Sequence, residues 1–319
     1  MRIVCDAHIP FIVEAVHKEW SDVDICPIKP EEIDSKVVRD ADVLIVRTRT
    51  HVNEALLAGS SVRLVCTATI GFDHIDTKYC ESHGIRWISC PGCNAQAVCD
   101  YIEEAINTIT DHQSPITNAP TIGVIGVGHV GRLVAKMAER KGMKVLLNDP
   151  PKGIGESLDF IGQNSDIITF HVPLDKSTYH MCDEAFLAKC KPGALIINAA
   201  RGGVVDEQAL LRSGHPYILD TWENEPDINL DVLAHARLAS MHIAGYSVEG
   251  KRNATQMCLD AIAKEFGLKP IDISGYRYHV ITGSRINNSE PWLAAITRQL
   301  KANPTSFEAL RKAYPLRGV

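Results

Sequence analysis

The sequence predicts an α/β protein built on parallel sheets. Two observations predict it. Short apolar runs alternate along the chain with longer segments of helical period, and a G-x-G-x-x-G turn follows one of those runs and opens a helix. Strands that alternate with helices imply βαβ units, which place the strands parallel. The 319 residues are enough for two domains, and the 45% of hydrophobic residues can fill sizeable cores.

The elements follow in two series. The expected strands of the first series are 2–5, 42–47, 63–69 and 84–89. A long helix is expected over 94–113, and the breaker-rich "SPITNAP" ends it. The strands of the second series are 121–126, 143–149, 165–172, 193–199, 217–220 and 237–243. Beyond Gly267, residues 268–284 are expected to be β-rich, and 290–316 to form two short helices separated by Asn303 and Pro304.

Composition excludes several classes of protein. The net charge of -6 and the pI of about 6.1 argue against a nucleic-acid binder, which usually carries a basic face. No run of 18 apolar residues is present, so we expect no membrane helix. The start "MRIVCDAHIP" lacks the long apolar segment of a signal peptide, and the ten cysteines have no small-scaffold spacing. These features predict a cytoplasmic protein.

One group of cysteines could in principle bind a metal ion. Cys90 and Cys93 have C-x-x-C spacing, with Cys80 and Cys99 nearby, and such spacing can bind zinc or perform redox chemistry. No second C-x-x-C or paired histidines follow at zinc-finger spacing, and "CPGC" looks like a turn between a strand and a helix. We therefore expect ordinary buried thiols and no metal.

The stretch "TIGVIGVGHVGRLVAKMAERKGMKVLLNDP" predicts a dinucleotide site. Gly126 allows a tight turn, Gly128 lets the backbone reach a pyrophosphate, and Gly131 lets the helix pack on the strand. The helix start offers unpaired N–H groups to the phosphates, with His129 at the surface and its backbone facing the ligand. Asp149 ends the next strand and can accept hydrogen bonds from ribose hydroxyls, which favours NAD over NADP.

Three later strand ends offer candidates for chemistry. Arg201 lies in "INAARGGVVDEQALL", Glu225 in "ILDTWENEP" and His242 in "RLASMHIAGY". Ligands of open parallel sheets bind beyond the carboxyl ends of the strands, so the three can converge. Oxidation of an alcohol needs a base, for which histidine is suited, and a carboxylate can stabilise its protonated form. Arginine can hold a substrate carboxylate through two parallel hydrogen bonds. His171, at a similar strand end, remains an alternative base.

The motifs "IGVIGVGHVG", "NAARGGVVDEQAL", "DTWENEP" and "HIAGYSVEGK" together resemble the D-isomer-specific 2-hydroxyacid dehydrogenase family. The resemblance implies that Arg201, Glu225 and His242 are the catalytic residues. It implies two doubly wound parallel-sheet (Rossmann-like) lobes and a short C-terminal α+β segment. The expected divisions are a catalytic domain of 1–91 plus 246–267, an NAD-binding domain of 92–245, and a shortened dimerisation-like segment of 268–319.

The resemblance also implies ligand contacts. Thr48, Thr69 and Tyr246 fall where substrate is expected. The positions expected to contact NAD are Gly126, Gly128, His129, Val130, Gly131, Asp149, Val172, Ala199, Ala200, Arg201, Asp220 and Gly245. Val172 stands where a threonine is expected, so it can offer only its backbone.

The implied activity is NAD-dependent oxidation of a small phosphorylated 2-hydroxyacid by a homodimer that binds neither nucleic acid nor membrane. Two alternatives stay open. The substrate could be another 2-hydroxyacid, such as 3-phosphoglycerate or glyoxylate. The chain could also be an NAD-sensing regulator without turnover, although none of the three catalytic residues is missing.

Overall fold

The computed structural model describes residues 1–110, 119–276 and 291–317. The chain divides into two compact units. Unit 1 is Met1–Asn94 with Tyr246–Val280 and Leu316–Val319, and unit 2 is Ala95–Gly245 with Ile281–Pro315. Residues 268–319, which the sequence sets apart as one segment, are thus shared between the two units.

Unit 1 contains a five-stranded sheet in the order β2-β1-β3-β4-β5, with every pair parallel. Its strands are β1 (Arg2–Asp6), β2 (Asp24–Ile28), β3 (Val43–Val46), β4 (Leu64–Thr67) and β5 (Arg86–Ile88). Its helices are α1 (Ile12–Glu19), α2 (Glu54–Leu57), α3 (Thr77–Ser82) and α10 (Val248–Phe266), with a 3-10 turn at Pro30–Glu32.

Both faces of this sheet are covered. Successive residues of β1 point to opposite faces, so Ile3 joins a cluster with Cys258 and Leu259 of α10, whereas Val4 joins a second cluster with Leu57. All of these side chains are fully or almost fully buried. A parallel sheet buried on both faces needs strands that are apolar throughout, which is why these runs stand out in the sequence.

Unit 2 contains a seven-stranded sheet in the order β12-β11-β10-β9-β6-β7-β8. Its strands are β6 (Thr121–Ile125), β7 (Lys144–Asp149), β8 (Ile154–Gly155), β9 (Ile167–Phe170), β10 (Leu195–Asn198), β11 (Tyr217–Leu219) and β12 (Leu238–Ala239). Only β8 pairs antiparallel within this sheet. The strand order reverses at β6, which lies between β7 and β9, and such a switch point is where ligands bind in open α/β sheets.

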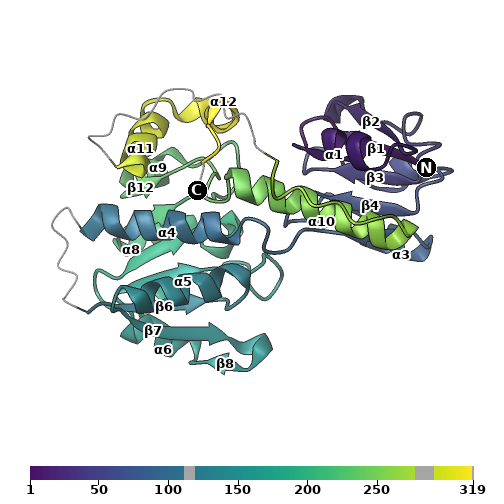
Figure 1. Cartoon of the computed structure of the whole chain (residues 1–319). Coiled ribbons are helices and arrows are strands. Elements are labelled where there is room, and N and C mark those ends of the chain that lie inside the picture. Colours follow the sequence, from purple (N-terminus) through teal and green to yellow (C-terminus); the bar gives the residue numbers. More distant parts are fainter. Residues whose placement is uncertain (111–118, 277–290, 318–319) are drawn as a thin grey trace. The chain divides into compact units, whose positions relative to one another are not determined.

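The helices of unit 2 include α4 and α5, which lie side by side against this sheet (Figure 1). They are α4 (Ala95–Thr110), α5 (His129–Arg140), α6 (Leu158–Asn164), α7 (Glu184–Leu187), α8 (Glu207–Ser213), α9 (Leu230–His235), α11 (Trp292–Ala302) and α12 (Phe307–Ala313). Three-residue 3-10 turns occupy Pro150–Lys152, Gly202–Val204 and Pro304–Ser306.

The predicted α/β class and both strand series are confirmed. Two strands were not predicted. β2 carries Pro27, which is tolerated because the strand lies at the edge of its sheet, and β8 has only two residues. The prediction of β structure over 268–284 is wrong for its described part, since Leu268–Tyr276 contains no strand, and 277–284 lie outside the described residues. The two helices predicted near the end are α11 and α12.

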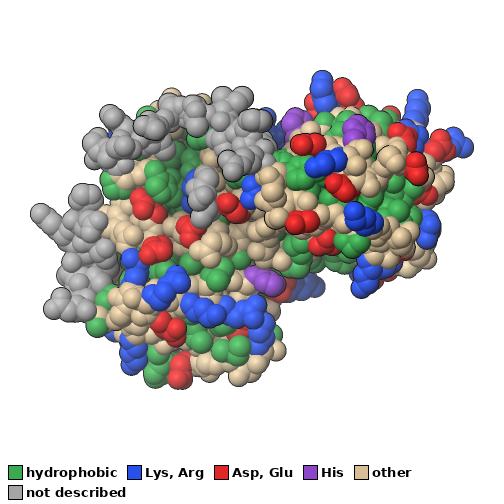
Figure 2. All heavy atoms as spheres, viewed as in Figure 1, with side chains coloured by type: hydrophobic (Ala, Val, Ile, Leu, Met, Phe, Trp, Pro, Cys, Tyr) green, Lys and Arg blue, Asp and Glu red, His purple; other side chains and the backbone are tan. Residues whose placement is uncertain are grey.

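No helix among the described residues is long and apolar enough to cross a membrane. Acidic and basic side chains both occur across the face of the molecule shown in Figure 2.

Candidate active site

The glycine turn after β6 forms a cradle at the start of α5. Gly126 has φ +88°, and a Cβ there would lie 2.6 Å from the carbonyl oxygen of His171. A Cβ on Gly131 would overlap the carbonyl oxygen of Gly126, so helix and turn can approach only without side chains. A Cβ on Gly128 would meet nothing, because it faces open space. The α5 N-terminus has no side-chain cap, which leaves its N–H groups available to an anion.

The other residues predicted around this turn lie beside it. His129 is exposed as the first residue of α5, and Val130 follows half-buried. Val172 follows β9 at the switch point, where its Cγ1 would lie 2.9 Å from a Cβ on Gly126. The arrangement fits the pyrophosphate of a dinucleotide.

Asp149 ends β7 as predicted, and it is held firmly. Its Oδ2 accepts hydrogen bonds from the Val127 amide at 2.8 Å and from the Lys152 ammonium at 2.7 Å. Burial alone would raise the pKa of Asp149, but these bonds outweigh it and the pKa lies below its ordinary value. The charged carboxylate therefore stays available to ribose hydroxyls. Lys152 is missing from the prediction, although its spacing of three residues from Asp149 could have suggested the ion pair.

His242 and Glu225 form the predicted pair. The Nδ1 atom of His242 lies 2.8 Å from Oε2 of Glu225, and Trp222 donates its amide to Oε1 at 2.9 Å. Burial alone would raise the pKa of Glu225, but the hydrogen bond and charge of His242 outweigh it and lower the pKa. A carboxylate can only accept here, so Nδ1 carries the proton and Nε2 of a neutral imidazole is free to act as a base.

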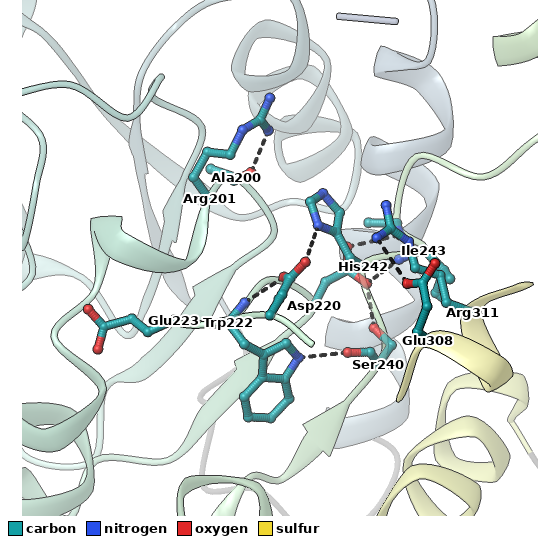
Figure 3. Close-up of polar contacts among 12 residues, drawn as sticks. Ala200, Arg201, Asp220, Trp222, Glu223, Ser240, His242, Ile243, Glu308 and Arg311 are labelled. Carbon is teal, nitrogen blue, oxygen red and sulfur yellow. Dashed lines mark hydrogen bonds and ion pairs between the residues drawn. The ribbon is translucent and has the colours of Figure 1, made fainter. Parts of the chain in front are cut away.

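The backbone at His242 is unusual, and Asp220 holds it. His242 has φ +57°, which a side chain with a Cβ adopts rarely. Asp220 accepts hydrogen bonds from the Ser240 hydroxyl at 2.6 Å and from the amides of Ile243 at 2.7 Å and Ala244 at 3.0 Å. Figure 3 shows Asp220 among these groups. The side chain of Asp220 is only 1% exposed, so its visible role is to fix the turn that carries His242.

Arg201 lies at the end of the loop after β10. Asn198 shapes this loop, because its side chain accepts from the Ala200 amide at 3.1 Å and donates to the Arg201 carbonyl at 2.8 Å. Ala199, Ala200 and Arg201 are half-buried. The guanidinium donates to the Ala200 carbonyl at 2.8 Å and forms no ion pair within the described residues. The Arg201 and His242 side chains project to the same side of the site (Figure 3).

His171, the alternative base, is unsuited to that role. Its Nε2 lies 3.1 Å from the Thr169 hydroxyl, and no carboxylate pairs with it in the described part of the chain. Burial lowers the pKa of His171 to about 3, so it stays neutral and accepts a proton poorly near neutral pH. The geometry favours His242.

The positions where substrate was expected all belong to unit 1. Thr48 is exposed, and Thr69 is half-buried with its hydroxyl donating to the Gly71 carbonyl at 2.9 Å. Tyr246 is half-buried. It is the residue at which the chain returns to unit 1, directly after Gly245 of unit 2. Residues from the first and last parts of unit 1 thus contribute candidate contacts.

The cysteines form no visible metal site. Cys90 is fully buried and its thiol donates to the carbonyls of Thr67 and Ala254, both at 3.3 Å. A contact with Cys258, and burial, raise the pKa of Cys90 well above its ordinary value. Burial raises the pKa of Cys93 to about 12, so both remain protonated. No group of metal-ligating side chains occurs among residues that the structure describes.

Comparison with known proteins gives a consistent picture. The model of the D-isomer specific 2-hydroxyacid dehydrogenase NAD binding domain matches residues 103–244. The chain is 41% identical to an erythronate-4-phosphate dehydrogenase of Bacteroides fragilis over 99% of this chain and 97% of that enzyme. It is 36% identical to an erythronate-4-phosphate dehydrogenase of an Enterobacter strain over 98% of this chain and 91% of that enzyme.

Solved structures are similar as well. A 3-phosphoglycerate dehydrogenase of Entamoeba histolytica with NAD⁺ bound has a TM-score of 0.73 and 25% identity, over 84% of this chain and 95% of that one. A D-lactate dehydrogenase of Aquifex aeolicus, complexed with NAD and lactic acid, has a TM-score of 0.67 and 26% identity, over 83% of this chain and 96% of that one. The predicted cofactor, NAD, is confirmed.

Proposed function

This chain belongs to the D-isomer specific 2-hydroxyacid dehydrogenase family, and on that premise we propose that it oxidises 4-phospho-D-erythronate with NAD. The product is (R)-3-hydroxy-2-oxo-4-phosphooxybutanoate, on the route to pyridoxal 5′-phosphate. The observation that carries the chemistry is the His242–Glu225 pair, with Arg201, which forms no ion pair among the residues described, on the same side of the site. The choice of substrate is supported by the likeness to erythronate-4-phosphate dehydrogenases over nearly the whole chain.

The cradle around Gly126, Gly128 and Gly131 fits NAD, and Asp149 would bind its adenosine ribose. When bound, NAD supplies the acceptor for the hydride that leaves C2 of the substrate. Arg201 binds the substrate carboxylate through its planar fork and so fixes C2.

His242 removes the proton of the 2-hydroxyl group through Nε2. The imidazolium that forms is stabilised by the carboxylate of Glu225, which contacts the opposite ring nitrogen. The C2–H electron pair leaves as hydride and the O–H electron pair forms the second C–O bond, which gives the 2-oxo acid. In this proposal Arg201 also polarises the developing keto oxygen.

The substrate assignment is tested with the purified native chain and a panel of acids. We expect kcat/KM for NADH formation to be at least tenfold higher with 4-phospho-D-erythronate than with D-erythronate or 3-phospho-D-glycerate. Glyoxylate with NADH tests the reverse reaction. A preference for 3-phosphoglycerate or glyoxylate would reassign the substrate, and NAD binding without turnover of any acid would favour the regulator. We also propose a homodimer, which light scattering would detect.

A further inference from the structure

We propose that Lys251 is the residue that binds the phosphate group of the substrate. The proposal rests on the proposed function, because it assigns one end of that substrate to a group of unit 1. It starts from a cluster of charges around Asp6 that the chemistry described above does not use.

Lys251 lies in the first turn of α10, just after the point where this helix starts. The helix begins after Ser247, whose hydroxyl caps it by accepting the Gly250 amide at 2.9 Å. The Lys251 side chain is half-buried, and its ammonium lies 5.8 Å from the centre of the Tyr246 ring. Among the described residues, this ammonium forms neither a hydrogen bond nor an ion pair. A cation is thus held partly out of water beside a residue expected to touch substrate.

Asp6, whose negative charge acts on Lys251, already has other partners. Asp6 is fully buried at the end of β1, and Arg47 donates to its two oxygens at 2.7 and 3.3 Å. The amide of His8 donates to Oδ1 at 2.8 Å, and its ring nitrogen Nδ1 lies 3.1 Å from the same oxygen. One negative charge therefore faces the two positive charges of Arg47 and Lys251, and the cluster has one positive charge in excess.

The environment makes this excess costly without a ligand. Burial lowers the pKa of Lys251, and the charge of Arg47 lowers it further, against the opposite effect of Asp6. Desolvated cations in proteins are normally paired, so an unpaired one that repels a neighbour points to an anion that arrives from outside. A dianionic phosphate fits best, because lysine binds phosphate as a point charge and does not need the planar geometry of arginine.

Tyr246 is a position where substrate is expected, and the centre of its ring lies 5.8 Å from the Lys251 ammonium. The proposed substrate carries a carboxylate at one end and a phosphate at the other, and each of these anions needs a cation. With Arg201 assigned to the carboxylate, Lys251 is the cation of unit 1 that we assign to the phosphate.

The test compares three variants of the full-length protein: Lys251→Met, Lys251→Arg and Lys264→Met. Lys264 is an exposed lysine of the same helix and serves as the matched control. The measured quantity is kcat/KM for 4-phospho-D-erythronate divided by kcat/KM for D-erythronate. We expect this ratio to fall at least tenfold in Lys251→Met, to be largely restored in Lys251→Arg, and to stay native in Lys264→Met.

A merely structural lysine would behave differently. Because the Lys251 ammonium repels Arg47, its removal should leave the melting temperature unchanged or raised, whereas loss of a structural contact would lower it. A ratio that does not change in Lys251→Met, or a fall that is equal for both acids, overturns the proposal.

Failure of the proposed function is recognised separately. If the native chain does not prefer 4-phospho-D-erythronate, binding of inorganic phosphate is measured by calorimetry on the native chain and on the same variants. At least tenfold weaker binding to Lys251→Met alone then supports an anion site at Lys251 for a different phosphorylated acid. Equal binding to the native chain and Lys251→Met, or no binding to either, overturns it.

Discussion

Replacement of Arg201 by lysine is the sharpest test of the carboxylate site. The guanidinium is half-buried and forms no ion pair within the described residues, so its charge is available for substrate. Lysine keeps the charge but loses the two parallel hydrogen bonds to a carboxylate. A charge-assisted bond of this kind contributes about 1.5–3 kcal/mol. At about 1.4 kcal/mol per tenfold change, Arg201→Lys should lower kcat/KM by roughly a hundredfold.

The assay is steady-state NADH formation combined with direct titration of NAD. Affinity for NAD should change little, because the backbone of 199–201 lines the predicted cofactor site while the side chain serves the substrate. Arg212→Lys is the control, since Arg212 is an exposed arginine of α8 that pairs with Glu184 at 3.3 Å. If Arg201→Lys weakened NAD binding as much as it slowed turnover, the anion would be the phosphate of the cofactor and the carboxylate role would be refuted.

Four further substitutions test other groups of unit 2. Glu225→Gln removes the charge that stabilises a protonated His242. A screened ion pair of this kind contributes about 2 kcal/mol, so steady-state measurements should show kcat lowered roughly 30-fold with unchanged affinity for NAD. Asp149→Ser should narrow the preference for NAD over NADP, and Lys152→Met should widen it because Lys152 offsets the charge of Asp149; equal affinities of the native chain for both cofactors would contradict this. Burial raises the pKa of Glu207 from 4.5 to about 7, so loss of its proton destabilises the folded state increasingly as pH rises from about 4.5 to 7. Glu207→Gln removes the ionisable group and should raise the melting temperature by roughly 2–4 °C at about pH 8, and by less at about pH 5. An equal gain at both pH values would show that titration of Glu207 is not the cause.

Much of the fold could be predicted from sequence because parallel strands buried on both faces are short, continuous apolar runs. The segments that became β1, β3 and β4 of unit 1 are of this kind. β2 was not predictable on the same ground, since only Ile25 of its five residues is buried and Pro27 interrupts it. Edge strands are defined by their neighbour more than by their own composition, so their pattern in sequence is weak.

In the site, too, features that depend on nearby residues were predictable, and features that depend on distant contacts were not. The glycine turn and Asp149 were predictable because their roles depend on spacing within one βαβ unit. The choice between His242 and His171 was not predictable from the residues alone, and it was the family resemblance that favoured His242. Both follow apolar strands. In the structure they differ in that His242 contacts a carboxylate 17 positions away, whereas the pKa of His171 is lowered to about 3. The role proposed for Lys251 was not predictable either, because it depends on the ion pair between Arg47 and Asp6, which are far from Lys251 in the sequence.

Asp220 and Glu225 are two carboxylates of one short segment, and they act on different parts of His242: Asp220 holds the backbone turn, and Glu225 contacts the ring. Asp220 has both oxygens occupied by the turn that follows β12, and it thereby stabilises a backbone conformation at His242 that would otherwise cost about 1–3 kcal/mol. Glu225 has one oxygen anchored by the Trp222 amide, which leaves the other to face the imidazole. The first carboxylate sets where the ring stands, and the second sets which of its nitrogens carries the proton. A base that must take a hydroxyl proton needs both conditions at once, so the identity of either carboxylate means little until its partners are known.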